Sequence, residues 1–428
     1  MRGNIVIVGG GAGGLELASR LGRTLGPASV TLVDCRLFHV WKPSLHEVAA
    51  GTLDLHQEGL SYQMLAHDNG FTFVYGPLTG LDAAAHTLTV GAVRDLDGDV
   101  LLAERSVDFT SLVIAVGSTS HYFGVPGAEA HTISLNATED AERFRLRLLK
   151  QLAQADLRQS GGVDIVIIGG GATGVELAAE LREASGVYAA YGFQHLQPER
   201  DVRITLLEGA PRILAPLTAQ VAKAAHALLE QRRIRVVTDC RVTAIEAHQV
   251  TDAGGAVYPA SLCVWAAGIR APAFLAQLGL PTNKNGQIVV DGQLRVQGVA
   301  GVFALGDCAA CMDADGKLVP PRAQAAHQQA DYLRRQLIRL ARGQGLRAAP
   351  YAYRDYGSLV SFGHRNTVGS LMGSLRGLHF FVEGFFARMM YVSLHLMHHA
   401  AVLGVRKTGV LALARFLIKR SSPLVKLH

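Results

Sequence analysis

The sequence predicts an α/β fold built on buried parallel sheets, and three observations support this prediction. The same strand, glycine turn and helix start occurs twice, as VIVGGGAGGLELASRL over Val6–Leu21 and as VIIGGGATGVELAAEL over Val166–Leu181. Each copy opens with an apolar β-branched run, which is typical of a strand buried on both faces of a parallel sheet. The chain has 428 residues, 49% of them hydrophobic, which fits two to three domains with sizeable cores.

Each copy passes from strand to helix through the spacing G-x-G-x-x-G. The first glycine permits a tight turn, the second lets a pyrophosphate approach the backbone, and the third lets the helix pack close to the strand. The helix start supplies amide donors and a partial positive charge. We therefore expect two Rossmann-like dinucleotide-binding domains. Their predicted binding residues are Gly9, Gly11, Ala12, Gly13 and Gly14 in the first copy and Gly169, Gly171, Ala172, Thr173 and Gly174 in the second.

An acidic residue closes the next predicted strand of both copies. Asp34, followed by Cys35, ends the first of these strands, and Glu208 ends the second, Val202–Leu207. A carboxylate at this position accepts hydrogen bonds from an adenosine ribose and repels a 2′-phosphate. Both sites are therefore expected to prefer FAD or NADH to NADPH, although Arg212 could soften that preference at the second site.

The stretch Gly301–Cys308, GVFALGDC, predicts a short strand that ends at Gly306 and Asp307. Asp307 is placed to accept hydrogen bonds from the ribityl hydroxyls of a flavin, so we expect FAD at the first site and NADH at the second. Because this stretch follows the second copy, the first domain is predicted to be split. Two further apolar strands run into small-residue turns that can pass over a dinucleotide. They are Leu112–Ser118, with Ala115 and Gly117, and Cys263–Ile269, with Gly268.

The segment Val319–Ala330, VPPRAQAAHQQA, predicts a helix with Pro321 in its first turn. Gln324 and Gln328 lie four residues apart on one face of that helix, beside alanines such as Ala323. Small side chains let a planar ring approach, and the amides can bond to carbonyl oxygens. An alanine-rich packing helix explains the same pattern, so the residues alone leave both alternatives open.

The stretch AQAAHQ resembles the AQxAxQ motif of type II NADH dehydrogenases, the single-subunit NADH:quinone oxidoreductases of respiratory membranes. Other similar stretches are Trp41–Leu53, Tyr353–Gly363 and Val382–Gly404. The resemblance spans the whole chain, is closest to proteobacterial members, and implies the glutathione-reductase-like arrangement of two dinucleotide-binding domains. Disulfide reductases of that superfamily carry a CxxxxC pair after the second strand. This chain has Cys35 alone there, which argues against a disulfide reductase.

The resemblance implies FAD bound without a covalent link, NADH as electron donor and a membrane quinone as acceptor in the respiratory chain, without proton pumping. It places Lys42 and Ser44 near the flavin, and it implies as catalytic residues Gln324 and Gln328, beside flavin and quinone, and Glu176, beside the nicotinamide. A glutamate in the first helical turn is also stabilised by the helix dipole alone, and Glu16 occupies the same position in the first copy. The role of Glu176 therefore stays open.

The basic excess of the chain lies in its C-terminal tail. The net charge is +6, from 41 basic and 35 acidic residues, yet no acidic residue and seven cations follow Glu383. Cations and histidines interrupt every apolar window of ~20 residues that a spanning helix would need. We expect an amphipathic helical segment over residues 384–428 that binds an anionic membrane surface. A core helix followed by a soluble basic tail is the alternative, and a nucleic-acid contact is disfavoured because aromatic and basic residues do not interleave.

The five cysteines include a Cys308-x-x-Cys311 pair directly after Asp307. It could be a redox pair, half of a zinc site or a local structural feature, and we favour the last. We predict no metal site, because neither a second CxxC nor a histidine pair of metal spacing accompanies it. The alternative functions are a sulfide:quinone oxidoreductase, for which these cysteines are weak support, and a flavin-bearing redox sensor without fast turnover.

The predicted organisation has four segments. Residues 1–120 and 296–375 form the FAD-binding domain, 121–295 the NADH-binding domain, and 376–428 a membrane-associating region. The N-terminal MRGNIVIVGGG enters the first strand directly, which leaves no room for a signal peptide. We expect a peripheral protein on the cytoplasmic side of the inner (plasma) membrane, and a homodimer by analogy only. The sequence does not choose between ubiquinone and menaquinone.

Overall fold

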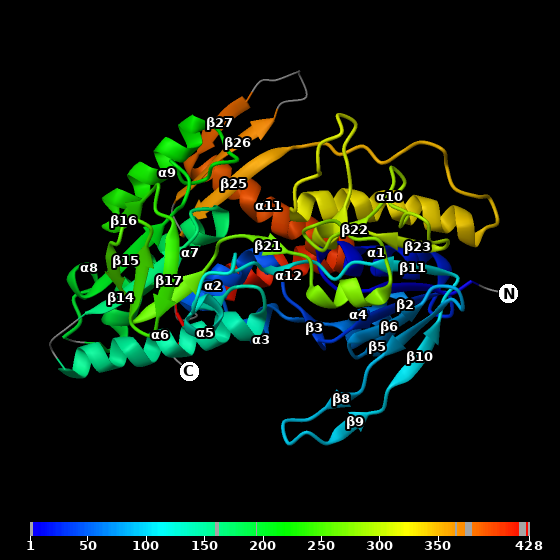
Figure 1. Ribbon diagram of the computed structural model, residues 1–428, viewed down its shortest axis with the longest axis horizontal. Helices are drawn as coiled ribbons and strands as arrows, with labels where there is room; N and C mark the ends of the chain where they lie inside the picture. Colours follow the sequence, from blue (N-terminus) through cyan, green and yellow to red (C-terminus); the bar gives the residue numbers. More distant parts are fainter. Residues whose placement is uncertain are drawn as a thin grey trace.

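The computed structural model describes residues 3–158, 162–193, 195–363, 366–372, 379–418 and 425–426. It confirms the α/β fold. Figure 1 shows two lobes side by side, each built around a parallel sheet, with the C-terminal helices running between and behind them. The first lobe carries the first glycine motif and the second lobe carries the second.

The first lobe contains a five-stranded parallel sheet in the order β23-β11-β1-β2-β5. Its strands are β1 (Ile5–Val8), β2 (Val30–Asp34), β5 (Thr72–Tyr75), β11 (Ser111–Ile114) and β23 (Val302–Ala304). Every residue of β1, β11 and β23 is buried, as their unbroken apolar runs predict. β23 pairs with β11 although the whole second sheet lies between them in the chain, so a late segment completes the first sheet.

The second lobe repeats this arrangement in the order β13-β20-β14-β15-β16. Its strands are β13 (Ile133–Ser134), β14 (Val163–Ile168), β15 (Val202–Leu207), β16 (Ile234–Val237) and β20 (Leu262–Trp265). In both sheets the glycine-motif strand is central, with the acid-terminated strand on one side and a later strand on the other. The carboxyl ends of the strands therefore present the glycine turns and the acidic residues at one edge.

Helices cover these sheets and join the lobes. The helices after the glycine turns are α1 (Ala12–Leu25) and α7 (Ala172–Tyr191), and the other long ones are α6 (Thr138–Arg158), α9 (Ala219–Gln231) and α10 (Ala323–Ala341). α10 packs along α1. The short helix α2 (Leu45–Ala50) follows the first acidic strand, yet it packs on α6 and α7 and buries Leu45 and Val48 in the core of the second lobe. This crossing brings a segment of the first lobe to the second glycine helix.

Smaller elements complete the fold. In the first lobe, β6 (Leu78–Asp82), β7 (Thr87–Val90) and β10 (Arg105–Asp108) form an antiparallel sheet, and β8 (Val93–Arg94) pairs with β9 (Val100–Leu102). The second lobe has the antiparallel sheet β17 (Val242–Glu246), β18 (Gln249–Asp252) and β19 (Val257–Pro259). The short elements are α3 (Leu55–Glu58), α4 (Tyr62–Asn69), α5 (Ala128–His131), α8 (Pro198–Asp201), β3 (Phe38–His39), β4 (Leu60–Ser61), β12 (Thr119–Ser120), β21 (Ile269–Arg270), β22 (Ile288–Val289), β24 (Ala309–Ala310) and the 3-10 turns η1 (Lys42–Ser44), η2 (Ala273–Leu278) and η3 (Gly306–Cys308).

The C-terminal part consists of β25 (Gly357–Phe362), β26 (Asn366–Met372), β27 (His379–Glu383), α11 (Gly384–Leu403) and α12 (Val405–Ile418). Over the described residues, none of the helices combines the length and the apolar character that a membrane crossing requires. α11 is more deeply embedded than a surface-lying helix, because Val402 belongs to the core of the first lobe and His398 and His399 are buried. Its outward face remains exposed.

Candidate functional site

The two glycine turns have the same geometry. Gly9 and Gly169 adopt φ of +102° and +111°, which L side chains rarely tolerate. A Cβ on Gly14 would lie 1.9 Å from the Gly9 carbonyl oxygen, and one on Gly174 would lie 2.0 Å from that of Gly169. No atom lies within 4 Å of a Cβ built on either Gly11 or Gly171. Each turn is therefore closed where the helix packs and open where a pyrophosphate would approach, beside the first amides of α1 (Ala12, Gly13) and α7 (Ala172, Thr173).

The acidic residues at the ends of β2 and β15 also match each other. Asp34 Oδ2 accepts from the Gly10 amide at 2.5 Å, and Glu208 Oε2 accepts from the Gly170 amide at 2.6 Å. The second oxygen of each carboxylate accepts from a backbone amide two residues further along. These bonds hold both carboxylates at the mouth of their glycine turn, with further lone pairs for ribose hydroxyls. Cys35, next to Asp34, is exposed.

Three residues meet where a flavin would extend away from the first glycine turn. The Ser118 hydroxyl donates to Asp307 Oδ2 at 2.7 Å, and Lys42 Nζ lies 3.4 Å from the Ser118 carbonyl oxygen. Burial lowers the pKa of Lys42, and the Asp307 carboxylate opposes that effect. A cation and an anion that are far apart in the sequence thus both contact Ser118.

The turns around this site come from several elements. The Gly306 amide donates to Gln329 of α10 at 2.7 Å, which fixes the Asp307 turn to that helix. Ala115 follows β11 and donates its amide to Val8, and Gly117 lies two residues further on. Ser44 is buried directly before α2. Gly268 follows β20, where a Cβ would lie 2.4 Å from the ring of Phe123.

Helix α10 begins at Ala323, two residues later than the first-turn Pro321 predicts, because Arg322 is extended. Gln324 and Gln328 both contact the segment Arg354–Gly357. Gln324 donates to the Gly357 carbonyl oxygen at 3.1 Å, and Gln328 both donates to and accepts from the backbone of Arg354, at 2.8 and 3.0 Å. The two side chains share a face, as their spacing predicts, and in this structure they anchor a loop.

Glu176 on α7 is paired with a histidine that the sequence analysis does not single out. Its Oε1 accepts from the Ser361 amide of β25 at 3.0 Å, and its Oε2 lies 3.7 Å from Nδ1 of His46 on α2. Burial raises the pKa of Glu176 to about 7, against the opposing effect of His46. Burial alone would lower the pKa of His46, but Glu176, Glu47 and Glu180 together raise it. A buried group with a pKa near neutrality can both release and accept a proton.

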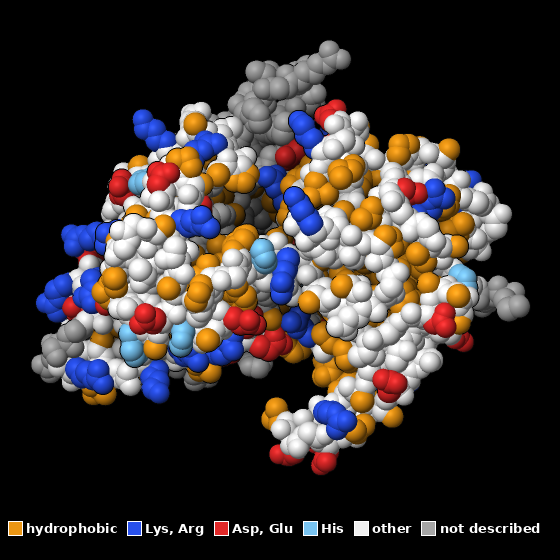
Figure 2. Space-filling model, in the orientation of Figure 1, with side chains coloured by type: hydrophobic (Ala, Val, Ile, Leu, Met, Phe, Trp, Pro, Cys, Tyr) orange, Lys and Arg blue, Asp and Glu red, His pale blue; other side chains and the backbone are white. Residues whose placement is uncertain are grey.

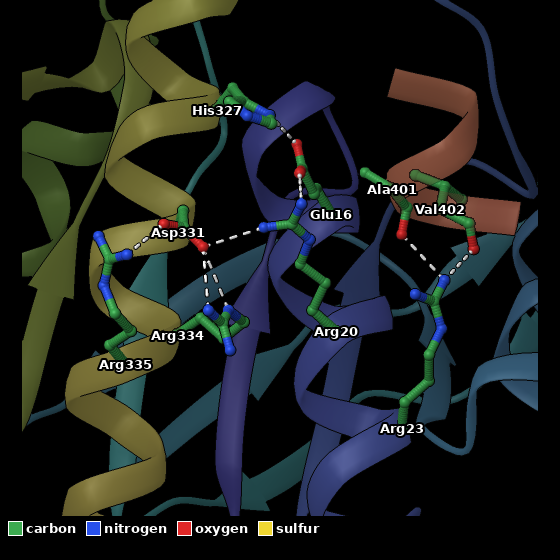
Figure 3. A network of polar contacts seen from close by, with 9 residues as sticks. All are labelled: Glu16, Arg20, Arg23, His327, Asp331, Arg334, Arg335, Ala401 and Val402. Carbon is green, nitrogen blue, oxygen red and sulfur yellow. Dashed lines mark hydrogen bonds and ion pairs between the residues drawn. The ribbon is translucent and has the colours of Figure 1, made fainter. Parts of the chain in front are cut away.

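Glu16 on α1, the counterpart of Glu176, has a different partner. Its Oε2 lies 2.7 Å from Nδ1 of His327 on α10, and its Oε1 lies 3.2 Å from Arg20. The bond to Glu16 raises the pKa of His327. Figure 3 shows this cluster continuing from Arg20 to Asp331 of α10, which ties the first glycine helix to the helix that carries Gln324 and Gln328.

The same glycine helix also holds the C-terminal helix. Figure 3 shows Arg23 of α1 reaching the last turn of α11, where its guanidinium donates to the carbonyl oxygens of Ala401 at 2.9 Å and Val402 at 2.6 Å. These carbonyls lie at a helix end and lack intrahelical partners, so a cation there is favourable. The start of α1 therefore lies at the predicted pyrophosphate site, its side packs against α10, and its end contacts α11.

Cys308 and Cys311 are buried thiols. Burial raises the pKa of Cys308 to about 12 and that of Cys311 to about 11, so neither is a thiolate near neutral pH. Since the thiolate is the reactive form, the raised pKa values support a local structural role for the two cysteines and argue against a redox pair. Cys308 instead donates weakly to the carbonyl oxygen of Leu305 at 3.2 Å.

Two hollows of the surface lie in different places relative to the first glycine turn. A cavity of about 900 Å³ is lined by Ile5, Ser111 and Phe303, at the opposite edge of the first sheet from the glycine turn. In parallel sheets ligands bind at the carboxyl ends of strands, so this cavity is not the dinucleotide site. Figure 2 shows a second hollow between the two lobes, with basic side chains at its rim.

Comparison with known proteins agrees with this geometry. Residues 3–330 match the model of the pyridine nucleotide-disulphide oxidoreductase family. A type II NADH:quinone oxidoreductase of Haemophilus influenzae is 36% identical over 445 residues, which cover 99% of this chain and 100% of the relative.

Solved structures share the fold. The NDH2 of Plasmodium falciparum in complex with NADH superposes with a TM-score of 0.83 at 18% identity and covers 100% of both chains. The sulfide:quinone oxidoreductase of Aquifex aeolicus has a TM-score of 0.74 at 20% identity, covering 94% of this chain and 92% of its own. The chain belongs to the pyridine nucleotide-disulphide oxidoreductase family and, within it, to the type II NADH:quinone oxidoreductases.

Proposed function

We propose that this chain oxidises NADH through a non-covalently bound FAD and reduces a membrane quinone. The duplicated glycine turn carries the proposal, because Gly11 and Gly171 each leave open space beside a helix start and an anchored carboxylate. The chain segments proposed for FAD are residues 1–120 and 296–375, and the segment for NADH is 121–295. Family membership supports this assignment.

The residues present fit FAD in the first lobe. The amides of α1 would bind its pyrophosphate, Asp34 its adenosine ribose and Asp307 its ribityl chain, with Lys42 beside the ring end. When bound, FAD supplies the two-electron chemistry that links hydride donation by NADH to quinone reduction. The chain's own contribution is alignment: Glu208 and the α7 amides would hold NADH in the second lobe, opposite the flavin.

Glu176 and His46 are proposed as a proton store for the reaction. Quinone reduction consumes protons, and Glu176, whose pKa is about 7, can supply one near neutral pH, leaving a carboxylate beside His46. Ser361 holds the Glu176 carboxylate from β25, so the pair belongs to α2, α7 and β25 together. Gln324 and Gln328 are proposed beside the quinone, which requires the segment Arg354–Gly357 to exchange its contacts with them.

The C-terminal helices are proposed to bind the cytoplasmic surface of the inner membrane as a peripheral anchor. Their outward face carries exposed large apolar side chains and the exposed cations Arg406 and Lys407. Apolar residues flanked by cations suit the headgroup region of an anionic bilayer. The exposed apolar residues are Met389, Val392, Leu394, Met397, Val405, Val410, Leu413 and Leu417. A homodimer remains a proposal by analogy.

Anaerobic mixing of the purified holoenzyme with NADH, followed by a short-chain quinone, tests the reaction. The visible absorbance of the flavin should fall after NADH is added, within the time of a single turnover. It should recover when quinone is added. Recovery with ubiquinone and menaquinone analogues would rank the two acceptors. Reduction by sulfide and not by NADH would assign the sulfide:quinone alternative, and slow reduction by NADH would favour the redox sensor.

The membrane proposal has a separate test. Serine at Val410, Leu413 and Leu417 together should abolish co-sedimentation with anionic vesicles and leave NADH oxidation by a soluble acceptor unchanged. The matched control places serine at Val100, Leu101 and Leu102, which are also exposed but lie on β9. Equal loss of binding in both variants, or retained binding in the α12 variant, would contradict the anchor.

A further inference from the structure

Three metal-ligating side chains converge where α3, α11 and α12 meet. They are Glu58 on α3 and His395 and His399 on α11, and their ligand atoms all lie within 4.8 Å of one another. His399 is buried and the other two are partly buried. This cluster joins α3 to the C-terminal helix α11 and contains none of the residues assigned to FAD, NADH or quinone.

A guanidinium holds the centre of this cluster. Arg415 of α12 contacts His395 Nε2 at 2.8 Å through Nη1, and through Nη2 it contacts His399 Nε2 at 3.4 Å and the Glu58 carboxylate. Arginine offers donors only, so both imidazole nitrogens present lone pairs to it. One cation is thus held by one carboxylate and two imidazoles, which are the donors that also bind a metal ion.

His399 is oriented as metal-ligating histidines commonly are. His399 Nδ1 lies 3.0 Å from the His395 carbonyl oxygen, so Nδ1 carries the proton and donates, and the Nε2 lone pair faces Arg415. A backbone carbonyl that fixes the second nitrogen of a ligating histidine is the usual outer support of such sites. Because the two histidines are four residues apart on one helix, their rings lie together, with centroids 4.3 Å apart.

We propose that Glu58, His395 and His399 form a binding site for a divalent transition-metal ion of the zinc type, and that the ion displaces Arg415. Two histidines and one glutamate, with water as a fourth ligand, are a donor set that zinc accepts. Zinc about 2.1 Å from each ligand atom brings those atoms to about 3.4 Å from one another, which needs a closure of up to about 1.4 Å from the 4.8 Å within which they now lie. Rotation of three side chains provides that closure once Arg415 has left.

Displacement of Arg415 gives the site a consequence for the fold. Arg415 is the residue through which α12 contacts both Glu58 of α3 and the two histidines of α11. An ion bound by Glu58, His395 and His399 replaces Arg415 as their partner. It therefore holds α3 more tightly to α11 and frees α12 from these contacts. The ion and Arg415 compete, and the arginine acts as an internal antagonist of metal binding.

The competition separates this site from casual metal binding by surface histidines. The purified holoenzyme is titrated with Co²⁺, whose visible absorption reports histidine and carboxylate coordination, and Zn²⁺ is then added to displace it. Arg415→Met should tighten Co²⁺ binding by about tenfold, since the ion no longer has to replace the charge-assisted contacts of the guanidinium, and His399→Ala, which removes a proposed ligand, should weaken it by at least about tenfold. Arg406→Met, an exposed cation of the same helix, is the matched control and should leave the titration unchanged.

The outcome can overturn the proposal in two ways. Equal Co²⁺ affinity in the wild type, Arg415→Met and His399→Ala would place the ion elsewhere on the chain. Hydrogen exchange gives a second readout in the unsubstituted holoenzyme: Zn²⁺ should speed exchange in α12 and slow it around Glu58 and His399. Slower exchange in α12 would show that the arginine stays in place, and the displacement model would then be wrong.

Discussion

The two glycine helices place a glutamate at the same position, and the two glutamates have different surroundings. Glu16 lies 2.7 Å from His327, whose side chain is 37% exposed, and it also contacts Arg20. Glu176 lies 3.7 Å from the buried His46 and accepts from the Ser361 amide. The first is a tight ion pair that joins two helices, and the second is a loose, buried pair in which the pKa of Glu176 is raised to about 7.

This difference shows that the partner, not the motif, decides what the carboxylate can do. Both glutamates come from the phrase GLEL or GVEL, and each is the fifth residue of its helix, just beyond the first turn in which the sequence predicts it. His327 arrives from α10 and His46 from α2, which crosses from the first lobe into the second. The 2.7 Å contact of Glu16 with His327 holds two helices together, whereas a buried carboxyl whose pKa is raised to about 7 can exchange a proton near neutral pH.

The largest expected effect comes from closing one glycine turn at a time. Gly14→Ala places a Cβ 1.9 Å from the Gly9 carbonyl oxygen, and Gly174→Ala places one 2.0 Å from that of Gly169. A strain of about 1–3 kcal/mol weakens binding by about 5- to 150-fold. Flavin content should fall in the first variant, and the second should retain flavin while its reduction by NADH slows. Loss of flavin in both would show that the lobes do not divide the cofactors.

Removing the charge of each glutamate should change the pH dependence of stability in different ways. The folded-state pKa of Glu176, about 7, lies above its ordinary 4.5, so the folded state binds more protons between these values. Wild-type stability therefore falls as pH rises through this window, by an amount on the order of 3 kcal/mol. Glu176→Gln keeps an acceptor for Ser361 and should flatten that fall, measured as Tm against pH with saturating FAD.

Glu16→Gln is the matched variant. The raised pKa of His327 contributes stability that is fully present below its ordinary value of 6.5 and is lost as pH rises through the folded-state pKa. The variant should therefore be destabilised most below pH 6.5, by about 1 kcal/mol after allowance for solvent screening. If both glutamine variants gave the same pH profile, the contrast between the two pairs would be refuted.

Removing the charge of Glu208 and of Asp34 should also have different effects, one on NADH binding and the other on flavin binding. Glu208→Gln retains an oxygen for the Gly170 amide but loses the charge that repels a 2′-phosphate. The KM for NADH should rise by about tenfold, as expected for a lost charge-assisted bond, and discrimination against NADPH should weaken. Asp34→Asn, its counterpart, should reduce flavin retention and leave the NADH preference unchanged. Unaltered selectivity in Glu208→Gln would remove the ribose assignment.

The smallest expected effect concerns the tie between the first glycine helix and the C-terminal helix. Arg23→Met keeps an apolar stem but removes the donors to Ala401 and Val402, which should cost about 1 kcal/mol. The thermal midpoint should fall by a few degrees, and hydrogen exchange should increase at the end of α11. Arg235→Met, on β16 of the second lobe, serves as the control and should leave α11 exchange unchanged.

Local sequence determined much of this fold. The apolar runs, the glycine spacing and the closing acids predicted β1, β2, β14 and β15 and the helices that follow, because each depends on contacts within a few tens of residues. The sequence also predicted that Gly301–Cys308 returns to the first lobe, and β23 lies beside β11. The predicted start of α10 at Pro321 was wrong by two residues, since the extended Arg322 separates Pro321 from the helix.

The tertiary structure alone decided the partners. His46 contacts Glu176, His327 contacts Glu16, and Glu58 reaches the His395–His399 pair across most of the chain. His395 and His399 stand four residues apart, which is a metal-ligand spacing once a helix is assigned to them, and our prediction of no metal site did not use that spacing. Side-chain pKa values, ion pairs and ligand sets depend on distances of a few ångströms between remote segments. The sequence by itself determined the two strand–glycine turn–helix units with their acidic residues. Only the packing of the lobes and of the C-terminal helices decided which side chains share a proton or a cation.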